Sequence, residues 1–403
     1  MSVLNILEEK LAETKKQGRF REFLNLERGV QDKPWATSHG HHGERRLNVW
    51  CSNDYLAMSH HPKVLLATTE AVNRVGLGTC GARSISGTSV YHSELETLLA
   101  SAYGKESALL FTTGFGANDA TLSTLCDAIP DLIVFSDELN HASMIYGIRY
   151  SKAEKKIFRH NDVAHLAELL QAADPARPKL IAFESLYSMD GDFAPLAQIV
   201  ALAEQYQALT YLDEIHSAGV YGERGLGYAE QLGLLDKITI IQGGFGKSSG
   251  AAGGYIAAPR SVVEAVRSWA PAFVFSTSSP APVVAAALAS FKYNLEHDTQ
   301  RKHLLAIVDH LKTGLRAAGI PLVSADSHIL PLRVGDPHRN KHISKVLLDE
   351  HDIYVQPVNA PTVPAGSERL RVTPTSAHSH ADVETFLAAL GRVWAANDLR
   401  RAG

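Results

Sequence analysis

The sequence predicts an α/β fold, in which a mostly parallel sheet carries helices on both faces and a smaller α+β domain follows it. Short apolar runs alternate with helical segments between residues 62 and 247. Strands that are apolar along their whole length are typical of parallel sheets buried beneath helices on both sides. The apolar runs span residues 108–111, 132–135, 180–183, 209–212 and 238–241.

The N-terminal segment, residues 1–50, is predicted to be an arm. Leu4, Leu7 and Leu11 recur at helical spacing among charged residues, which predicts an amphipathic helix over residues 3–17 that packs on a larger body. A polar, loop-like stretch follows this helix. Residues 47–51 then form a short apolar run that is typical of a strand.

The large domain is predicted over residues 51–285, with its polar residues at the ends of its strands. In open parallel sheets, ligands bind at the carboxyl ends of the strands. We therefore expect one ligand site at this edge of the sheet. The polar segments that follow the apolar runs are residues 112–115, 137–141, 184–190 and 213–216, and Lys247 follows the last run.

A smaller C-terminal domain is predicted over residues 286–403. Beyond residue 279 the composition changes to Ala- and Leu-rich helix. Short strands near residues 329–334 and 354–357 and a closing helix over residues 383–394 complete this domain.

The composition excludes several classes of function. The chain has 403 residues, of which 45% are hydrophobic and 20% are charged, as in soluble globular proteins. Its net charge of −4 does not indicate a nucleic-acid surface, and no apolar run reaches the length of a membrane span. Cys51, Cys80 and Cys126 are too few and too scattered for a disulfide framework or a zinc site. We expect a cytoplasmic protein without a metal, a membrane partner or a nucleic-acid partner.

Lys247 is the candidate for a covalent cofactor anchor. It follows a predicted strand and has glycines on both sides, which let a bulky cofactor approach the backbone closely. A lysine amine becomes a useful nucleophile toward an aldehyde when desolvation or a neighbouring cation lowers its pKa. A solvated lysine in a flexible loop is the alternative, and the neighbouring motifs decide between the two.

Four ordered motifs carry a resemblance to a known family. They are Asn-His-Ala-Ser-Met-Ile at residues 140–145, Glu-Ser-Leu-Tyr-Ser-Met-Asp-Gly-Asp at 184–192, Asp-Glu-Ile-His-Ser-Ala-Gly at 213–219, and Gly246-Lys247. Together they resemble the α-oxoamine synthase family of fold-type I pyridoxal-phosphate enzymes. The likeness covers nearly the whole chain, from residues 18–21 to residues 368–374. It implies pyridoxal 5'-phosphate as the cofactor.

The resemblance assigns a role to each matched residue around the cofactor ring. Lys247 would bind the cofactor covalently, and Asp213 would hold the pyridine nitrogen protonated, which makes the ring an electron sink. An incidental buried aspartate without such a cation would be costly. His216 would hydrogen-bond the phenolic oxygen, with a packing histidine as the alternative, and His141 would stack on the ring. Ser188 would donate to the phenolic oxygen or to the substrate carboxylate, and Glu184 would support this polar layer.

The cofactor phosphate needs backbone N–H groups at a helix start, together with hydroxyl groups. The turn at Thr113, Gly114 and Phe115 would supply the backbone N–H groups. Ser276 and Thr277 resemble the segment that the family contributes from the second subunit. The resemblance therefore implies a homodimer with shared active sites.

The substrate residues are also assigned by resemblance. Arg371 would bind the amino-acid carboxylate with help from Asn53, a task that suits a guanidinium group. Arg21 and Thr362 resemble elements that contact the carboxylate of a succinyl group. The reaction implied is a decarboxylating condensation of a small amino acid, glycine favoured, with an acyl-CoA, succinyl-CoA favoured. Lys247 would act as the general base, and His141 would polarise the thioester carbonyl.

Three positions depart from the family pattern. Residues 81–87 read Gly-Ala-Arg-Ser-Ile-Ser-Gly where the nearest members most often read Gly-Thr-Arg-Asn-Ile-Ser-Gly. Ala82 removes a hydroxyl and a methyl beside the amino-acid Cα, and Ser84 shortens the reach to an acyl carboxylate. Gly244 replaces a threonine that usually contacts the cofactor phosphate, which predicts weaker cofactor retention unless Ser248 or water substitutes.

Several alternatives stay open on the sequence alone. Alanine or serine is an alternative to glycine, and another CoA thioester or a carrier-protein thioester is an alternative to succinyl-CoA. An aminotransferase or a non-catalytic regulatory paralogue would keep the same fold. The presence of Lys247 and Asp213 disfavours the paralogue, and the Arg371 motif disfavours the aminotransferase. The pathway, tetrapyrrole supply or a secondary metabolite, is also open.

Overall fold

The chain folds into two compact units. The computed structural model describes residues 2–40, 43–397 and 399. Unit 1 consists of residues 1–53, 188–192 and 302–403, and unit 2 consists of residues 54–187 and 193–301. These units divide the chain differently from the predicted domains. The predicted arm belongs to the same unit as the C-terminal residues, and the predicted boundary after residue 285 falls inside helix α11 (Ala281–Glu296).

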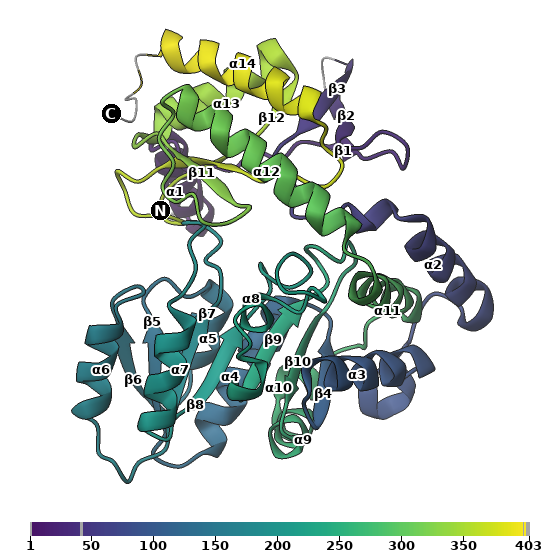
Figure 1. Ribbon diagram of the computed structural model, residues 1–403, viewed down its shortest axis with the longest axis vertical. Helices are drawn as coiled ribbons and strands as arrows, with labels where there is room; N and C mark the ends of the chain where they lie inside the picture. The colour runs from purple at the N-terminus through teal and green to yellow at the C-terminus, as the bar shows by residue number, and fades with distance from the viewer. Residues whose placement is uncertain (1, 41–42, 398, 400–403) are drawn as a thin grey trace. The chain divides into compact units, whose positions relative to one another are not determined.

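Unit 2 is built around a seven-stranded sheet with the strand order β4-β10-β9-β8-β7-β5-β6 (Figure 1). Strand β10 runs antiparallel to its neighbours β4 and β9, and the other neighbouring pairs run parallel. The predicted mostly parallel sheet is therefore confirmed. The strands are β4 (Ser107–Phe111), β5 (Ile133–Asp137), β6 (Glu154–Phe158), β7 (Lys179–Glu184), β8 (Leu209–Asp213), β9 (Ile240–Gly244) and β10 (Gly254–Ala258).

Helices cover both faces of this sheet, as predicted. Buried side chains of α3, α6, α7 and α11 pack on one face, and those of α4, α5, α9 and α10 pack on the other. Alternate residues of each strand point to opposite faces, so both cores include residues of the same strands. The helices are α2 (Pro62–Val75), α3 (Val90–Tyr103), α4 (Gly114–Ala128), α5 (Ala142–Arg149), α6 (Val163–Gln171), α7 (Leu196–Gln205), α8 (Tyr228–Gln231), α9 (Arg260–Trp269), α10 (Pro271–Val274) and α11.

The carboxyl ends of the parallel strands bring ionisable residues to one edge of the sheet. Strand β5 ends at Asp137, β7 at Glu184 and β8 at Asp213. Strand β9 ends at Gly244, three residues before Lys247. Because ligands of such sheets bind at the carboxyl ends of the strands, this edge is where a ligand site is expected.

Unit 1 has its own apolar core, which includes Trp50, Leu370, Phe386 and Trp394. Its two sheets have the orders β1-β2-β3-β12 and β11-β14-β13. None of the helices in the described part of the chain is long and apolar enough to cross a membrane. The elements are β1 (Leu26–Glu27), β2 (Trp35–Gly40), β3 (Gly43–Val49), β11 (Leu330–Arg333), β12 (Ile353–Tyr354), β13 (Gln356–Val358), β14 (Arg369–Val372), α12 (Thr299–Ala317), α13 (Pro337–His351) and α14 (His380–Ala396).

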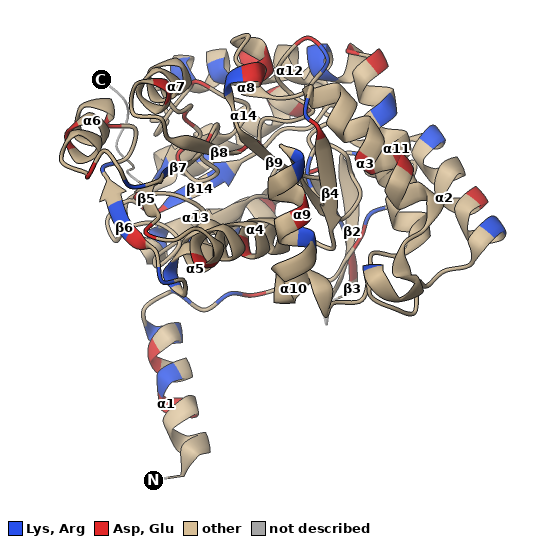
Figure 2. Ribbon diagram, turned by 90° about the horizontal axis from the view of Figure 1, so that it is seen from below, with Lys and Arg blue, Asp and Glu red and all other residues tan. Residues whose placement is uncertain are grey.

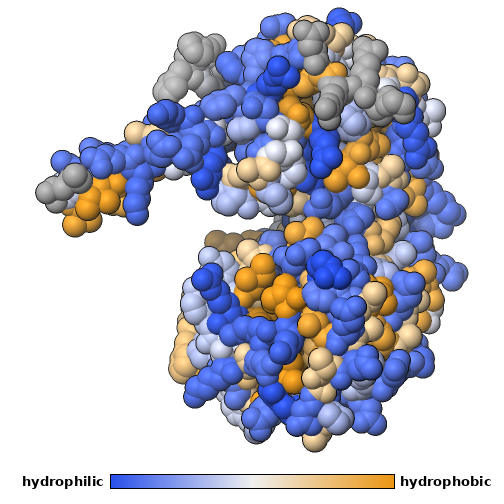
Figure 3. Space-filling view, turned by 90° about the vertical axis from the view of Figure 1, so that its left-hand side faces the viewer, coloured by the Kyte–Doolittle hydropathy of each residue, from blue (hydrophilic) through white to orange (hydrophobic). Residues whose placement is uncertain are grey.

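Helix α1 (Val3–Lys16) forms as predicted, but its apolar side chains are exposed. The exposed fractions of Leu4, Leu7 and Leu11 are 68%, 52% and 51%, and the helix has no buried residue. Charged residues of both signs lie along it (Figure 2), and apolar surface lies at its end (Figure 3). The prediction that this helix packs on a larger body is therefore wrong within the described part of this chain.

Candidate active site

A cavity of about 310 Å³, open to solvent, lies at the carboxyl ends of the unit 2 strands. Its size suits a cofactor, because small-molecule sites usually measure about 300–1,000 Å³. The structure brings seven of the predicted cofactor residues together here. They are Thr113, Gly114, Phe115, His141, Asp213, His216 and Lys247.

Lys247 stands in the connection between β9 and β10. The backbone N–H of Phe245 donates to the oxygen of Gly253 at 3.0 Å, and the N–H of Gly250 donates to the oxygen of Lys247 at 2.9 Å. These hydrogen bonds fix the shape of the loop. The lysine side chain is partly buried and close enough to Asp213 and His141 to interact with both electrostatically.

Asp213 is a buried carboxylate at the end of β8. Its Oδ1 accepts the N–H of Ile215 at 2.8 Å, and its Oδ2 accepts Nδ2 of Asn118 at 2.7 Å. Burial raises the pKa of Asp213, although these two hydrogen bonds oppose the shift. A carboxylate in this position gains from a cation beside it, and a protonated pyridine nitrogen is such a cation. The donor set therefore fits pyridoxal phosphate.

His216 lies in the same pocket and is 5% exposed. Its Nδ1 lies 2.8 Å from the hydroxyl oxygen of Tyr55, which is itself fully buried. This contact holds the imidazole in one orientation. The packing alternative raised from the sequence does not account for the place of His216 in the pocket lining.

His141 caps the N-terminus of α5, because its Nδ1 accepts the backbone N–H of Ser143 at 3.2 Å. The ring of Phe115 meets it edge-on, with 6.3 Å between the ring centroids. Burial lowers the pKa of His141, the charge of Asp213 opposes this shift, and the charge of Lys247 adds to it. The imidazole is therefore neutral at neutral pH.

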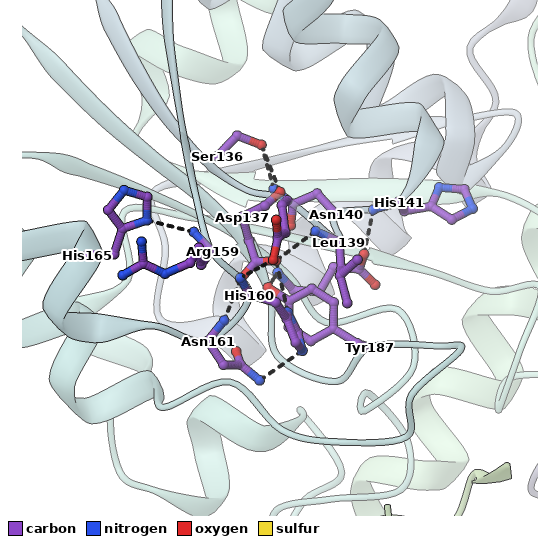
Figure 4. A network of polar contacts seen from close by, with 12 residues as sticks. Ser136, Asp137, Leu139, Asn140, His141, Arg159, His160, Asn161, His165 and Tyr187 are labelled. Atoms are coloured by element: carbon purple, nitrogen blue, oxygen red, sulfur yellow. Dashed lines mark hydrogen bonds and ion pairs between the residues drawn. The ribbon is translucent and has the colours of Figure 1, made fainter. Parts of the chain in front are cut away.

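Two buried carboxyl groups, those of Glu184 and Asp137, hold the turn that carries His141, and Figure 4 shows Asp137 beside this turn. Glu184 accepts the backbone N–H of His141 on its Oε1 at 2.6 Å. Asp137 accepts the N–H of Leu139 at 2.8 Å and lies 2.9 Å from Nδ1 of His160. Burial and then the charge of Asp213 raise the pKa of Glu184 well above its ordinary value. The turn is thus anchored by main-chain hydrogen bonds.

The predicted phosphate end lies at the start of α4. Thr113 caps this helix, because its Oγ1 accepts the N–H of Gly116 at 2.9 Å. Gly244 lies against Ile215, and a Cβ there would stand 2.7 Å from Cδ1 of Ile215. The hydroxyl of Ser248 is buried and donates to the oxygen of Ala218 at 2.5 Å. Ser248 therefore does not replace the threonine that Gly244 lacks.

Ser276 and Thr277 line a different and much smaller cavity of unit 2, which measures about 30 Å³. The Ser276 hydroxyl donates to the oxygen of Ala272 at 2.5 Å, and Thr277 forms an isolated antiparallel bridge with Ala82. Ser84 is exposed in a π-helical turn over Arg83–Gly87. Among the described residues, none of these four lines the Lys247 pocket.

The predicted substrate residues Asn53, Arg371, Arg21 and Thr362 all belong to unit 1, as does Ser188. Arg371 is buried on β14, where its Nε donates to the oxygen of Ser188 at 2.7 Å and its Nη1 donates to Oδ1 of Asn53 at 3.0 Å. Nη2 of Arg21 donates to Oγ1 of Thr362 at 3.0 Å. Two pairs that the sequence separates by more than 300 residues are thus joined within unit 1.

The sequence patterns do not identify four residues that line or support the pocket: Tyr55, Asn118, Ser143 and Ile215. Helical spacing offers a signal for Asn118, since it falls four residues after Gly114 and on the same face. The N-cap position of His141 offers a signal for Ser143, whose N–H the capping side chain accepts. Tyr55 leaves no such signal because its partner is 161 residues away.

The comparisons with known proteins cover nearly the whole chain. The family model for aminotransferases of class I and II matches residues 46–390. A 5-aminolevulinate synthase of Rhodobacter capsulatus is 48% identical, over 96% of this chain and 95% of that protein. A 5-aminolevulinate synthase of Paracoccus denitrificans is 49% identical, over 98% of each chain.

Solved structures resemble both units at once. A serine palmitoyltransferase structure with pyridoxal phosphate has a TM-score of 0.93 and 31% identity, and the match covers 99% of this chain and 100% of that chain. The serine palmitoyltransferase of Sphingomonas wittichii has a TM-score of 0.91 and 30% identity, with the same coverage.

Proposed function

Because the chain belongs to the aminotransferase class I and II family and to its α-oxoamine synthase branch, we propose that it is a 5-aminolevulinate synthase. It condenses glycine with succinyl-CoA to 5-aminolevulinate and releases CoA and CO2. Its cofactor is pyridoxal phosphate. The observation that carries this proposal is the identity of 48–49% to curated synthases over more than nine tenths of both chains.

The cofactor requires a lysine, a carboxylate and an anion-binding helix start, and unit 2 supplies all three in one pocket. When bound, pyridoxal phosphate supplies an electron sink for the electron pair released at the amino-acid Cα. Lys247 anchors the cofactor, Asp213 balances the charge of its ring nitrogen, and the first turn of α4 holds its phosphate. His216, which Tyr55 orients, would hydrogen-bond the phenolic oxygen of the cofactor.

Two groups move or hold protons in the reaction. Lys247 would take the proton from the Cα of the amino acid as general base. His141 is neutral and donates a hydrogen bond to the thioester carbonyl oxygen, where negative charge develops as the new C–C bond forms and the C–S bond breaks. Coenzyme A leaves as the thiol, and the carboxyl group of glycine leaves as CO2.

The residues that we propose to bind the substrate carboxylates belong to unit 1. Arg371 is the candidate for the glycine carboxylate, because a guanidinium group oriented by Ser188 and Asn53 suits a planar carboxylate. Arg21 and Thr362 are joined by a hydrogen bond and are the candidates for the succinyl carboxylate. Ser188 provides a backbone acceptor for Arg371, and its hydroxyl remains assigned to the cofactor or the substrate.

A second pair of substrates has support of its own. Ala82 stands where a threonine is usual, and the serine palmitoyltransferase structures match over the full chain. Serine or alanine with another acyl thioester is therefore the alternative. Ser84, which shortens the reach to an acyl carboxylate, likewise favours an acyl group other than succinyl.

We further propose a homodimer in which each subunit completes the site of the other. Ser276 and Thr277 line a cavity apart from the Lys247 pocket of their own chain, although hydroxyl groups are expected at the cofactor phosphate. Both observations are explained if Ser276 and Thr277 contribute their hydroxyl groups to the site of the partner subunit. The apolar side chains of α1 are also exposed, as at a surface that a second chain covers. A cytoplasmic location remains our proposal from the three cysteines.

One experiment tests the function directly. Purified enzyme with pyridoxal phosphate is incubated with glycine, alanine or serine against a set of acyl-CoAs, and free thiol and product mass are measured. Glycine with succinyl-CoA should give the fastest thiol release and the mass of 5-aminolevulinate. Lys247→Ala should abolish it, whereas Lys156→Ala, which alters an ion pair on strand β6, should not. Keto-acid-dependent amino transfer, or no thiol release with any pair, would overturn the proposal.

A further inference from the structure

A line of buried hydrogen bonds connects Asp213 with His141. Nδ2 of Asn118 lies 2.7 Å from Oδ2 of Asp213 and 2.9 Å from Oγ of Ser143. Oγ of Ser143 in turn lies 2.7 Å from Nδ1 of His141. Asn118 is 1% exposed and Ser143 is fully buried, so bulk water does not compete for these bonds.

The direction of each bond follows from the donors available. Asp213 accepts, so Asn118 turns its NH2 group toward it, and Oδ1 of Asn118 accepts the hydroxyl of Tyr211 at 2.7 Å. The amide nitrogen has two hydrogens, of which one goes to Asp213 and the other to Oγ of Ser143. The backbone N–H of Ser143 points at Nδ1 of His141, which makes this nitrogen an acceptor, and the single hydrogen of the Ser143 hydroxyl therefore points to it as well.

Nδ1 of His141 receives a second hydrogen bond from the backbone N–H of Ser143, at 3.2 Å. A ring nitrogen that accepts two hydrogen bonds carries no proton of its own. Because burial keeps the ring neutral, its single proton belongs to Nε2. The identity of the protonated nitrogen is thus decided by Ser143, which Asn118 orients, and both residues line the same pocket as His141.

We propose that Asn118 and Ser143 are positioning residues that hold His141 in the tautomer protonated on Nε2. The use of this tautomer rests on the proposed function, in which the thioester oxygen needs a hydrogen-bond donor. The other tautomer would place a lone pair on Nε2 and would repel the developing negative charge. Asp213, which would balance the charge of the ring nitrogen, is therefore also linked to His141 through Asn118 and Ser143.

The test measures the tautomer in the full-length holoenzyme labelled with 15N-histidine. Two-bond 1H–15N correlations distinguish the two tautomers, and the His141 signals are identified by their loss in His141→Phe. The wild-type spectrum should show an unprotonated Nδ1. Ser143→Ala should give a mixture of tautomers and lower kcat roughly three- to tenfold, with the KM for glycine unchanged, because one hydrogen bond is lost.

Two further variants separate this role from general stability. Ser151→Ala, in which another buried serine of the same segment loses a hydroxyl bonded to Ile148, should leave the tautomer and kcat unchanged. Tyr211→Phe keeps the shape of a buried ring and removes the third bond to Asn118. It should shift the tautomer in the same direction as Ser143→Ala and serves as the test if that variant does not fold.

The proposal is overturned if Ser143→Ala and Tyr211→Phe both retain a purely Nε2-protonated His141. The spectrum needs no substrate, so its outcome is independent of the reaction catalysed. An enzyme that makes no 5-aminolevulinate but whose tautomer follows Ser143 would contradict the proposed function and support this inference.

Discussion

Cδ1 of Ile215 occupies the space in which a side chain on Gly244 would begin, 2.7 Å from the position of its Cβ. The same methyl group lies 2.6 Å from where a Cβ on Gly114 would stand. One isoleucine therefore fills the space between the end of β9 and the start of α4. The glycine at position 244, which departs from the family pattern, is explained by this packing.

We expect Gly244→Thr to destabilise the protein by about 1–3 kcal/mol, because the new side chain forces Ile215 out of its place. Ile215→Val removes the obstructing Cδ1, so the double variant should recover part of this loss. Thermal unfolding of the four proteins measures the coupling. A Gly244→Thr variant as stable as wild type would show that Ile215 moves freely.

The double variant Ile215→Val, Gly244→Thr should also bind pyridoxal phosphate more tightly than wild type. It places a hydroxyl beside the expected phosphate, and a hydrogen bond to a charged group contributes about 1.5–3 kcal/mol. Equilibrium dialysis of the cofactor measures this. An affinity equal to that of wild type would contradict the assigned phosphate position.

Glu184 should make the cofactor-free protein less stable as the pH rises. Burial, and next the charge of Asp213, raise the pKa of Glu184 well above its ordinary value. The folded protein therefore keeps a proton that the unfolded chain releases above its ordinary pKa of 4.5. Stability from this carboxyl is fully present below that pH and is lost as the pH rises toward the folded pKa, at about 1.4 kcal/mol per pH unit for one proton.

Glu184→Gln removes this titration and keeps an acceptor for the N–H of His141. The difference in unfolding free energy between wild type and variant, measured by urea denaturation between pH 5 and pH 8, should change in favour of the variant as the pH rises. Comparing the two proteins cancels the other titrating groups. A difference independent of pH would contradict the raised pKa.

Arg371→Lys should raise the KM for glycine roughly tenfold or more while leaving cofactor affinity unchanged. Lysine lacks the planar fork that a guanidinium offers a carboxylate, and a lost charged hydrogen bond costs about 1.5–3 kcal/mol. Arg369→Lys is the matched control, because Arg369 lies on the same strand and pairs with Asp190 at 2.8 Å. Equal effects of both variants on KM would argue for a structural role of Arg371.

Mixed dimers test whether Thr277 acts on the partner's site. Thr277→Ala and Lys247→Ala should each have low activity alone. In a mixed dimer, the intact Lys247 of one subunit meets the intact Thr277 of the other. Random reassembly of equal amounts should then restore about a quarter of the wild-type activity. No recovery after verified reassembly would place Thr277 in the site of its own chain.

Five strands of the unit 2 sheet were predictable from their apolar sequences. Strands β6 and β10 were missed. Strand β6 (Glu154–Phe158) carries Glu154, Lys155 and Lys156 because it lies at the edge of the sheet, and its pattern resembles surface loop. Strand β10 (Gly254–Ala258) follows a glycine-rich segment and runs antiparallel, so neither its composition nor the parallel pattern identifies it.

Single residues at strand ends were predictable because their chemistry is local. Asp213 and Lys247 each follow a recognisable strand, so their meeting at one edge follows from the topology. Asn118 was not identified, since a buried amide inside a helix depends on partners from β8 and α5 that only the fold brings together. The exposed leucines of α1 are a second example of a property that depends on partners. Their spacing predicts an amphipathic helix, but it does not identify the surface against which the apolar side of that helix packs.

The division of unit 1 among three separate stretches of chain has a consequence for synthesis. Strand β3 pairs with β12, with Asn48 opposite Ile353, so β3 finds this partner strand only after the intervening residues, all of unit 2 among them, have been made. Unit 2 is complete by residue 301, well before that. Strand β3 therefore has only β2 as a neighbour while unit 2 is being made, and a truncation before residue 353 would leave it without its second partner strand.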